Sequence, residues 1–515
     1  MKKYIGIYCL LVITFIAGCI DDRGNYDYIS SDEVFPVKIT GLDTSFNCLV
    51  GDVLRVTPIV TGVEGMKNLK YTWFLYQRGI AYSAEDTLCH TKDLEYWVNC
   101  DVHNYNLLFE VRDTIRDLFV KKTLDLTVST TYSTGWFVLE DDGMNTDLDM
   151  VENGKTTENL MTTFGSARME GKAKKIVFKD RHPQEVEGPD GTVTKEYKKA
   201  FTVISERDMR VYDAQNMSVL KYRNDCFYEM PTSMKPLDVA TESSSDEVNI
   251  DGKFYLMSTG NIGKFGYPVM GVDGTENYSI FEEGILYSNY CYLWDNVSKS
   301  FVHAYSGNSK FNFLNEAKDG EVNNGAVSNT GCEMKRFQFR NYEYKYGVTP
   351  STWTAYALWV NQEGKYEILD LTFVSTNYPI KSKYNLPDGS GLPMAEVMAV
   401  HQTETKMFFS KENQLYEHIV NSKTDLKSRE RVVYTFPAGE EIACIRHIIA
   451  EKNVGEPMNR LVVLTNSVNG WKLYGFEFIN GGGEFDMTVL PEEAMIGQGE
   501  GNARYVMRMD NNRNF

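Results

Sequence analysis

Residues 354–370 read as a β-hairpin: TAYALWV (354–360), a turn at Gly364, and YEILD (366–370). Aromatic and β-branched residues are frequent in both runs, and these residue types favour strands. A glycine between two such runs is a typical hairpin signal. The segment therefore predicts two antiparallel strands, and it represents the pattern of most of the chain around it.

Similar strands recur along the chain, at residues 136, 201, 253, 285, 354, 406 and 461. Their mean spacing is about 54 residues, close to the length of known blade repeats once loop insertions are allowed. This repetition predicts an all-β fold with a β-propeller of about seven blades over residues 132–515, because radial closure removes exposed sheet edges. The last strand, residues 503–508, is expected to pair with the first blade and lock the ring. The spacings range from 32 to 69 residues, and stacked β-sandwiches are the alternative architecture.

A group of shorter strands precedes the propeller-like region. Alternating apolar and polar residues occupy 37–40, 53–57, 69–75, 106–112 and 122–128. Short strands at such intervals are typical of an immunoglobulin-like sandwich, and the strands that contain Trp73 and Tyr105 resemble PKD-type domains. We therefore predict a PKD/Ig-like β-sandwich over residues 35–131, with Trp73 between its two sheets.

The amino terminus has the pattern of an export signal. Two lysines precede an apolar run over residues 4–15, and the tetrad IAGC (16–19) follows. A positive start, a short apolar segment and small residues define a secretory signal peptide, and the tetrad resembles a bacterial lipobox. We therefore expect a lipoprotein signal peptide over residues 1–18, which is cleaved between Gly18 and Cys19.

The expected product of this processing is a lipid-anchored chain. Cys19 is the predicted lipidation site, and outer-membrane lipid is its predicted partner. Residues 19–34, with Asp21 and Asp22 directly behind the cysteine, form the expected acidic tether. Acidic residues at this place resemble the surface-export signal of Bacteroidota lipoproteins, so we expect the protein to face the cell exterior.

Length and charge limit the classes of function. The chain has 515 residues, more than the roughly 250–300 residues at which a single hydrophobic core stops growing. Its 53 Lys and Arg against 71 Asp and Glu give a net charge of −18. Binding to nucleic acid depends largely on Lys and Arg that neutralise phosphates, so we expect no nucleic-acid partner.

The search for catalytic and metal-binding motifs gives no site. HExxH, GxSxG, P-loop and DxDxDG patterns are absent from the sequence, and the seven histidines form no ligand-like pair. Cys89-His90 and Cys100-x2-His103 resemble metal ligands at first sight, but small buried or edge residues are the favoured interpretation. A Cys89–Cys100 disulfide stays open. We predict no catalytic residue, no metal and no cofactor.

Two further features have a functional and a structural interpretation. Glu140, Asp141 and Asp142, followed by Asp147 and Asp149, have the oxygen ligands that Ca²⁺ prefers, but a solvated hairpin turn is the favoured interpretation.

The aromatic residues are the second such feature. Trp353 and Trp471 are candidate exposed rings for stacking on sugars or peptides, although most strand aromatics are expected to fill the spaces between blades. No ligand-binding residue is nominated.

Several motifs together resemble the PKD-like family of Bacteroidota outer-membrane lipoproteins. They are the lipobox, Asp21-Asp22, GNYDY (24–28), the PKD-like strands, GWFVL (135–139) and YTFPAGEEI (434–442). The resemblance implies an accessory lipoprotein of SusC/SusD-type uptake systems, which captures or delivers a nutrient at the cell surface without catalysis. A glycan, an oligopeptide or a metal chelate is the possible ligand. A propeller-scaffold polysaccharide lyase or glycosidase is the alternative function, and an adhesin is a further one.

Overall fold

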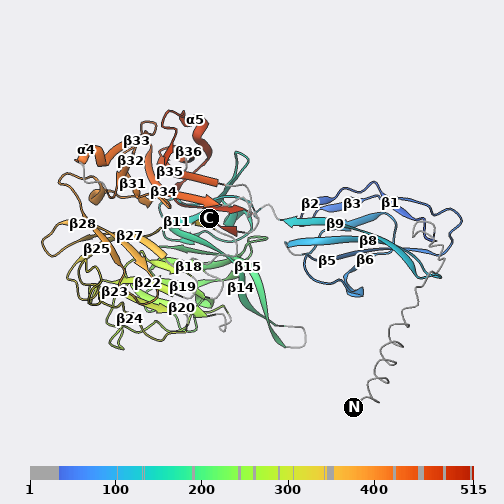
Figure 1. Ribbon diagram of the computed structural model, residues 1–515, viewed down its shortest axis with the longest axis horizontal. Coiled ribbons are helices and arrows are strands. Elements are labelled where there is room, and N and C mark those ends of the chain that lie inside the picture. Colours follow the sequence, from blue (N-terminus) through green and yellow to red (C-terminus); the bar gives the residue numbers. More distant parts are fainter. Residues whose placement is uncertain are drawn as a thin grey trace, which may run out of the picture. The chain divides into compact units, whose positions relative to one another are not determined.

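The computed structural model describes residues 34–515 except 101–102, 130–131, 133, 188–191, 242–244, 259–262, 288–289, 306, 341–342, 345–352, 422–424, 451–457, 480–482, 511–512 and 515. The expected signal peptide, its cleavage point at Gly18 and Cys19, and the tether up to residue 33 lie outside the described residues. The chain divides after Ser129 into two compact units (Figure 1). No helix in the described ranges is long and apolar enough to cross a membrane.

The first unit is a β-sandwich. One sheet has the order β2 (Ser45–Leu49), β9 (Leu118–Ser129), β8 (His103–Asp113), β5 (Leu69–Gln77) and β6 (Thr87–Cys89). Two strand pairs pack against it, β1 (Lys38–Thr40) with β4 (Ile59–Thr61) and β3 (Val53–Val56) with β7 (Leu94–Trp97). A single short 3₁₀ turn, η1 (Ala84–Asp86), precedes β6 in the described part of this unit.

Trp73 of β5 is the centre of the sandwich core. Its side chain is fully buried, its ring packs on Phe109 of β8 with centroids 4.5 Å apart, and its Nε1 donates to the carbonyl of Lys92 at 3.1 Å. A buried indole needs such an acceptor, because an unpaired N–H in an apolar core is costly. The predicted position of Trp73 between the sheets is therefore confirmed.

The second unit is a β-propeller whose described residues form seven sheets. Blade 1 contains β39 (Asn502–Asp510), β10 (Gly135–Asp141), β11 (Asn145–Glu152) and β12 (Lys155–Thr157). Blade 2 contains β14 (Ala173–Glu187), β15 (Val193–Ser205), β16 (Met209–Asp213) and β17 (Val219–Lys221). Blade 3 contains β18 (Pro236–Thr241), β19 (Ser245–Ile250) and β20 (Lys253–Ser258). A bridge between Tyr255 and Pro268 stands in the place of a fourth strand in blade 3.

Blades 4 to 7 follow in the order of the sequence. Blade 4 contains β21 (Ile285–Tyr287), β22 (Tyr290–Asp295), β23 (Ser300–Tyr305) and β24 (Asn312–Phe313), and blade 5 contains β25 (Glu333–Arg340), β27 (Trp353–Val360), β28 (Tyr366–Phe373) and β29 (Ile380–Asn385). Blade 6 contains β30 (Met398–Val400), β31 (Lys406–Lys411), β32 (Gln414–Ile419) and β33 (Glu430–Thr435). Blade 7 contains β34 (Glu441–Ala450), β35 (Met458–Ser467), β36 (Gly470–Ile479) and β38 (Met495–Gly499).

Short elements decorate this ring. Two-residue strands extend four of the sheet edges: β13 (Met169–Glu170), β26 (Glu343–Tyr344), β37 (Glu484–Phe485) and β40 (Arg513–Asn514). The helical turns are α3 (Leu160–Thr163), α4 (Leu426–Arg429), α5 (Pro491–Ala494), η2 (Arg223–Asp225) and η3 (Leu392–Met394). The β14–β15 hairpin projects from the body of the propeller (Figure 1).

The C-terminal strand closes the ring. β39 pairs antiparallel with β10 from Gly135 opposite Met509 to Asp141 opposite Asn502. Blade 1 is thus built from the last strand of the chain and the first strands of this unit, so β10 has no open edge at that side. The predicted pairing of residues 503–508 with the first blade is confirmed, and the closed ring excludes the stacked sandwiches.

The first-named strand of each blade is the innermost one. These seven strands, or the residues directly before them, line one central cavity. Lys175 of β14 binds Asp238 of β18 at 2.6 Å, and Thr241 donates to the carbonyl of Phe178 at 2.7 Å. Because both contacts advance by three residues on each strand, β14 and β18 run parallel. The same direction follows for β25 and β30, since Arg336 and Gln338 reach the carbonyls of Glu396 and Met398.

The sequence predicted the number of blades correctly but misplaced most of the strands within them. The seven strands read as first strands fall one in each blade, but β10, β15, β27, β31 and β35 are second strands and β20 is third. Only β21 is a first strand. Second strands are covered on both faces by neighbouring blades and are therefore strongly apolar. Innermost strands line a polar cavity, and their charged residues conceal them in a hydrophobicity pattern.

Hydrophobic cores fill the space between each pair of adjacent blades. Trp294 and Trp359 pack between blades 4 and 5, and Trp471 packs between blades 7 and 1. Trp353 and Trp471 are only 9% and 1% exposed. Their interpretation as exposed stacking rings is wrong, because a propeller needs large side chains to fill the wedge between radiating sheets.

Candidate functional site

The central cavity of the propeller is the candidate site. It has a volume of about 650 Å³ and is lined by residues from all seven blades. A site of this kind collects side chains that are far apart in the sequence, since each blade contributes one strand. None of its residues was nominated as a site residue from the sequence.

Positive groups gather on three consecutive innermost strands, β34, β39 and β14. They are Arg446, Arg504, Lys174 and Lys175. Arg446 lies over the ring of Tyr505, 5.0 Å from its centroid, and donates to the carbonyl of Val506 at 2.6 Å. Carbonyl and ring contacts of this kind orient a guanidinium.

Ion pairs neutralise two members of this group. Lys175 is bound by Asp238; burial opposes its charge, but Asp238 and Tyr505 outweigh that effect and raise its pKa. Arg504 Nε donates to Asp141 at 2.9 Å. Lys174 has no such partner among the described residues, and its charge remains available to a ligand.

Negative groups occupy the opposite side, on the blades that follow. They are Asp238, Glu282, Glu283 and Glu396. Glu283 accepts from the backbone N–H of Phe337 at 2.6 Å and from the amide of Gln338 at 3.4 Å. Burial raises the pKa of Glu283. Glu282 and Glu396 are exposed in the cavity wall.

A guanidinium separates these carboxylates. Arg336 of β25 donates to the carbonyls of Lys335, Ala395 and Glu396 at 3.0, 3.3 and 3.0 Å. Its field lowers the pKa of Glu283, against the dominant effect of burial. The wall between blades 5 and 6 is therefore held by side chains that bind backbone carbonyls, which fixes the shape of the cavity.

A neutral histidine closes another part of the wall. His447 of β34 accepts a hydrogen bond from the backbone N–H of Gln402 at Nδ1 (3.0 Å), and its Nε2 contacts Asn459 Oδ1 at 2.7 Å. Burial lowers its pKa to about 4, although the contact with Asn459 works in the opposite direction. Its ring also packs against His401, with centroids 4.3 Å apart. His447 thus joins blades 6 and 7 without carrying charge.

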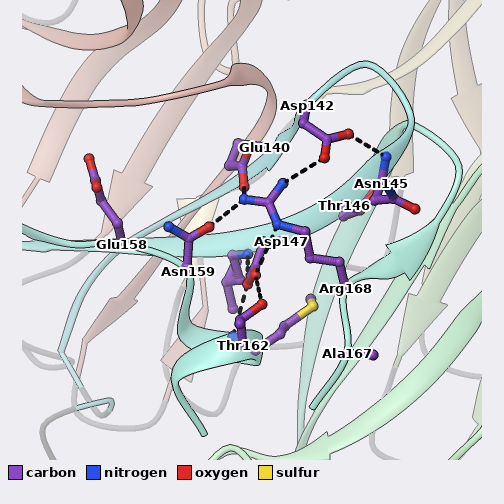
Figure 2. Close-up of polar contacts among 12 residues, drawn as sticks. Glu140, Asp142, Asn145, Thr146, Asp147, Glu158, Asn159, Thr162, Ala167 and Arg168 are labelled. Carbon is purple, nitrogen blue, oxygen red and sulfur yellow. Dashed lines mark hydrogen bonds and ion pairs between the residues drawn. The ribbon is translucent and has the colours of Figure 1, made fainter. Parts of the chain in front are cut away.

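The acidic segment of blade 1 forms a separate buried cluster (Figure 2). Glu140 and Asp147 are 2% and 0% exposed. Arg168 enters between them, with ion-pair distances of 3.1 Å to Glu140 and 3.6 Å to Asp147. It also donates to the side chain of Asn159. Asp147 in turn accepts from the backbone N–H of Met161 and the hydroxyl of Thr162, at the start of α3.

This cluster links three blades. Asp149 accepts from Trp471 Nε1 of blade 7 at 2.9 Å, and Asp141 accepts from Arg504 and from the backbone N–H of Ala173 in blade 2. Burial, reinforced by neighbouring carboxylates, raises the pKa of Glu140 to about 8, although Arg168 acts in the opposite direction. Burial likewise raises the pKa of Asp149 to about 7.

Both sequence interpretations of this segment need correction. Glu140, Asp141, Asp147 and Asp149 are buried, so they do not form a solvated hairpin turn; only Asp142 lies exposed at the turn. Arg168 occupies the centre where a cation would stand, which makes the cluster an internal ion-pair network. Within the residues that the structure describes, no group of three or more His, Cys, Asp or Glu is arranged to hold a metal.

Blade 6 places a serine, a glutamate and a histidine together. His418 Nδ1 lies 2.9 Å from Glu430, and the hydroxyl of Ser390 donates to the same carboxylate. A catalytic serine instead needs its hydroxyl on the imidazole, which removes its proton. The order of contacts here stabilises the loop before η3 and does not activate a nucleophile.

The seven cysteines within the described residues are present as free thiols. In the sandwich they are Cys48, Cys89 and Cys100, and in the propeller Cys226, Cys291, Cys332 and Cys444. Burial raises the pKa of the four propeller thiols, which makes them poor nucleophiles. The Cys89–Cys100 bridge considered from the sequence is not formed.

Comparisons with known proteins match the first part of the chain to a family. The model of the PKD-like family matches residues 19–173, which span the sandwich and the first strands of the propeller up to the start of β14. The comparison with curated proteins gave no match.

Several solved structures are similar to most of the chain. One is a quinonprotein alcohol dehydrogenase-like protein from Bacteroides thetaiotaomicron, at 12% identity and a TM-score of 0.39, covering 90% of this chain and 96% of that chain. Another is Hsv2p of Kluyveromyces lactis, at 8% identity and a TM-score of 0.35, covering 72% and 95%.

A third is the extracellular domain of a putative one component system from B. thetaiotaomicron, at 10% identity and a TM-score of 0.31, covering 65% and 39%. Similarities at this level say nothing about what this chain binds. The chain itself joins a PKD-like segment at its amino end to an all-β propeller that its last long strand closes.

Proposed function

We propose that this protein is a non-catalytic binding protein that holds a small nutrient in the central cavity of its propeller. In this proposal it acts as an outer-membrane lipoprotein, anchored through Cys19 and facing the cell exterior, and serves a SusC/SusD-type uptake system as an accessory. Its role in this system is to deliver the captured nutrient to the transporter.

The cavity is the observation that carries the proposal. Its volume of about 650 Å³ lies within the roughly 300–1,000 Å³ that is usual for small-molecule sites. Charged side chains from all seven blades converge on it, and two of them, Arg336 and Arg446, are fixed by hydrogen bonds to backbone carbonyls. A wall that is ordered before binding loses little entropy when a ligand enters, which favours recognition.

The chemistry of the wall favours binding over turnover. Glu283 and Lys175 are engaged by a backbone amide and by Asp238, and His447 is a neutral part of the wall. General acid–base catalysis needs a proton-transfer group aimed at the substrate, whereas these groups are aimed at their own supports. The PKD-like match begins at residue 19, the first residue that the expected cleavage before Cys19 would leave.

Filling the cavity tests the proposal. Ala240 of β18 and Ala443 of β34 line the cavity and are half-buried, so Ala240→Phe and Ala443→Phe should occupy ligand space. The full chain is immobilised and exposed to a pepsin digest of casein mixed with malto-oligosaccharides, and retained molecules are identified by mass spectrometry. We expect retention that both variants abolish and that the exposed Ala326→Phe leaves unchanged.

Two outcomes would contradict the proposal. Equal retention by the unsubstituted chain and by Ala240→Phe would place binding outside the cavity or exclude it. Products that are absent from the starting mixture would show turnover, and the protein would then be an enzyme.

A further inference from the structure

We propose that the cavity selects short peptides with free termini, whose carboxylate lies at the basic side and whose ammonium group lies at the acidic side. This inference rests on the proposed function, because it names the class of nutrient that the cavity takes. The wall is divided into two halves of opposite charge, and the division follows the order of the blades.

The basic half recognises a carboxylate. Arg446 of β34 and Lys174 of β14 lie on strands on either side of β39, because the innermost strands follow the order β34, β39, β14 around the ring. Lys175 and Arg446 are within electrostatic range of each other, so a second anion beside Asp238 is favoured there. A carboxylate can accept from Lys174 and from the guanidinium of Arg446, and charge-assisted hydrogen bonds of this type are strong in a partly enclosed site.

The acidic half recognises an ammonium group. Glu282 and Glu396 lie in the cavity wall, three residues before β21 and two residues before β30. Arg336 between them donates to three backbone carbonyls, which orients its guanidinium along the wall. The exposed carboxylates of Glu282 and Glu396 can accept hydrogen bonds from a cation that donates them.

Glu396 and Arg446 are also offset along the cavity. Gln402 lies beside His447, the neighbour of Arg446, and Glu396 lies six residues earlier on the same segment of chain. At about 3.3 Å per residue, six residues place Glu396 at most roughly 20 Å from Gln402, the residue beside His447. An extended peptide of up to about six residues covers this upper limit, and its two charged termini lie further apart than those of a single amino acid.

A glycan would not use this arrangement. Neutral sugars bind through hydroxyl networks and aromatic platforms, and the wall offers separated unlike charges instead. The chain has a net charge of −18, so a concentration of four basic residues on three adjacent strands is a local feature of the cavity and does not reflect the composition. Peptides carry one charge of each sign at fixed ends, which matches the two halves.

Blocking the termini of the ligand tests the inference. Peptides of about three to six residues from a pepsin digest of casein are divided into untreated, amine-acetylated and methyl-esterified portions. Each portion is mixed with malto-oligosaccharides and offered to the immobilised full chain, with Ala240→Phe as the blocked reference. We expect each modification to lower retention about tenfold or more, because each removes one charged contact.

The outcomes separate this inference from the proposed function. Equal retention of modified and untreated peptides, or retention of the oligosaccharides alone, would overturn the inference and leave cavity binding intact. Retention of nothing above the Ala240→Phe level would overturn the proposed function as well.

Substitutions assign the two ends. Lys174→Met should weaken retention of the untreated and acetylated peptides, which keep the carboxylate, but not of the esterified ones. Glu282→Gln should weaken retention of the untreated and esterified peptides, which keep the ammonium group, but not of the acetylated ones. Lys318→Met and Glu64→Gln, at exposed positions that are not among the lining residues of the cavity, are the matched controls. An equal loss for all three peptide portions would show a general defect and would contradict the assignment.

Discussion

Arg168 is the residue that makes the buried acidic cluster of blade 1 possible. Its guanidinium lies within 3.6 Å of Asp147 and 3.1 Å of Glu140 (Figure 2), and the carboxylates come from two paired strands. Buried carboxylates without such a partner would be very costly. Even so, one positive charge faces several carboxylates, so an excess of negative charge remains. Protonation of Glu140 and Asp149, whose pKa values are raised, removes part of that excess.

The first prediction is that Glu140→Gln reduces the pH dependence of propeller stability. The pKa of Glu140 rises from its ordinary 4.5 to about 8 in the folded chain, so the folded chain keeps a proton that the unfolded chain has released. The contribution of protonated Glu140 to the free energy of unfolding is complete below pH 4.5 and is lost as pH rises through about 8. Each such proton is worth about 1.4 kcal/mol of unfolding free energy per pH unit.

The measurement is the free energy of unfolding in urea at several pH values between 5 and 8. The unsubstituted propeller should lose stability as pH rises, and Glu140→Gln should lose it less steeply; Asp149 contributes the slope that remains. Glu64→Gln, at an exposed position, should keep the original slope. Parallel curves for Glu140→Gln and the unsubstituted chain would refute the protonated state of Glu140.

Sequence inspection grouped the correct acidic residues but gave them the wrong surroundings. Nothing local indicates that Arg168, 28 positions after Glu140, returns to the cluster. The return depends on α3 and the loop behind it, and on Asn159, whose backbone adopts a left-handed conformation with φ of 57°. The spacing of charged residues therefore located the cluster, while its burial followed from the packing of three blades.

At the scale of elements, β39 carries the closure of the ring. Its Ala503 and Val506 are fully buried in the core between blades 7 and 1, together with Trp136 and Val138 of β10. Gly501, with φ of 78°, allows the chain to turn into this strand beside Glu140, where a Cβ atom would lie 2.1 Å from the carboxylate. A glycine is required there on both grounds.

The second prediction is that a chain ending at Gly501 loses the cooperative unfolding of the propeller. Removal of β39 exposes the edge of β10 and its apolar side chains, which destabilises blade 1 and promotes association of open edges. Thermal unfolding followed by circular dichroism, with size-exclusion chromatography, measures both effects. A chain ending at Asp510 keeps β39 and should unfold as the full chain does; equal behaviour of the two truncated chains would refute the closure role.

The pattern of strands shows what sequence can and cannot identify at this scale. The second strands, such as β27 and β35, are buried on both faces and were found as apolar runs. The innermost strands β14, β18 and β25 contain Lys175, Asp238 and Arg336 and were missed, because their polar residues face a cavity that exists only in the closed ring. The final strand was found because both its sequence and its position at the end of the chain indicated closure.

The whole molecule combines a predictable plan with an unpredictable site. Two units, an all-β composition and about seven blades followed from hydrophobic periodicity, and the structure has all three. The cavity could not be predicted, since each of its charged residues is ordinary within its own strand. Only the ring order places Arg446 and Lys174 on one side and Glu282 and Glu396 on the other.

The last prediction concerns the expected anchor of the whole chain. If Cys19 is lipidated, several acyl chains on one residue hold the protein in the outer membrane far more firmly than a single chain would, since each buried methylene contributes about 0.8 kcal/mol. Cys19→Ala should therefore move the full-length protein from the membrane to the soluble fraction. Immunoblotting of fractionated cells measures this, and Cys9→Ala, within the expected signal peptide, is the control that should leave the distribution unchanged. Membrane retention of the Cys19→Ala protein would show that another element holds it, and it would remove the anchor on which surface delivery to a transporter depends.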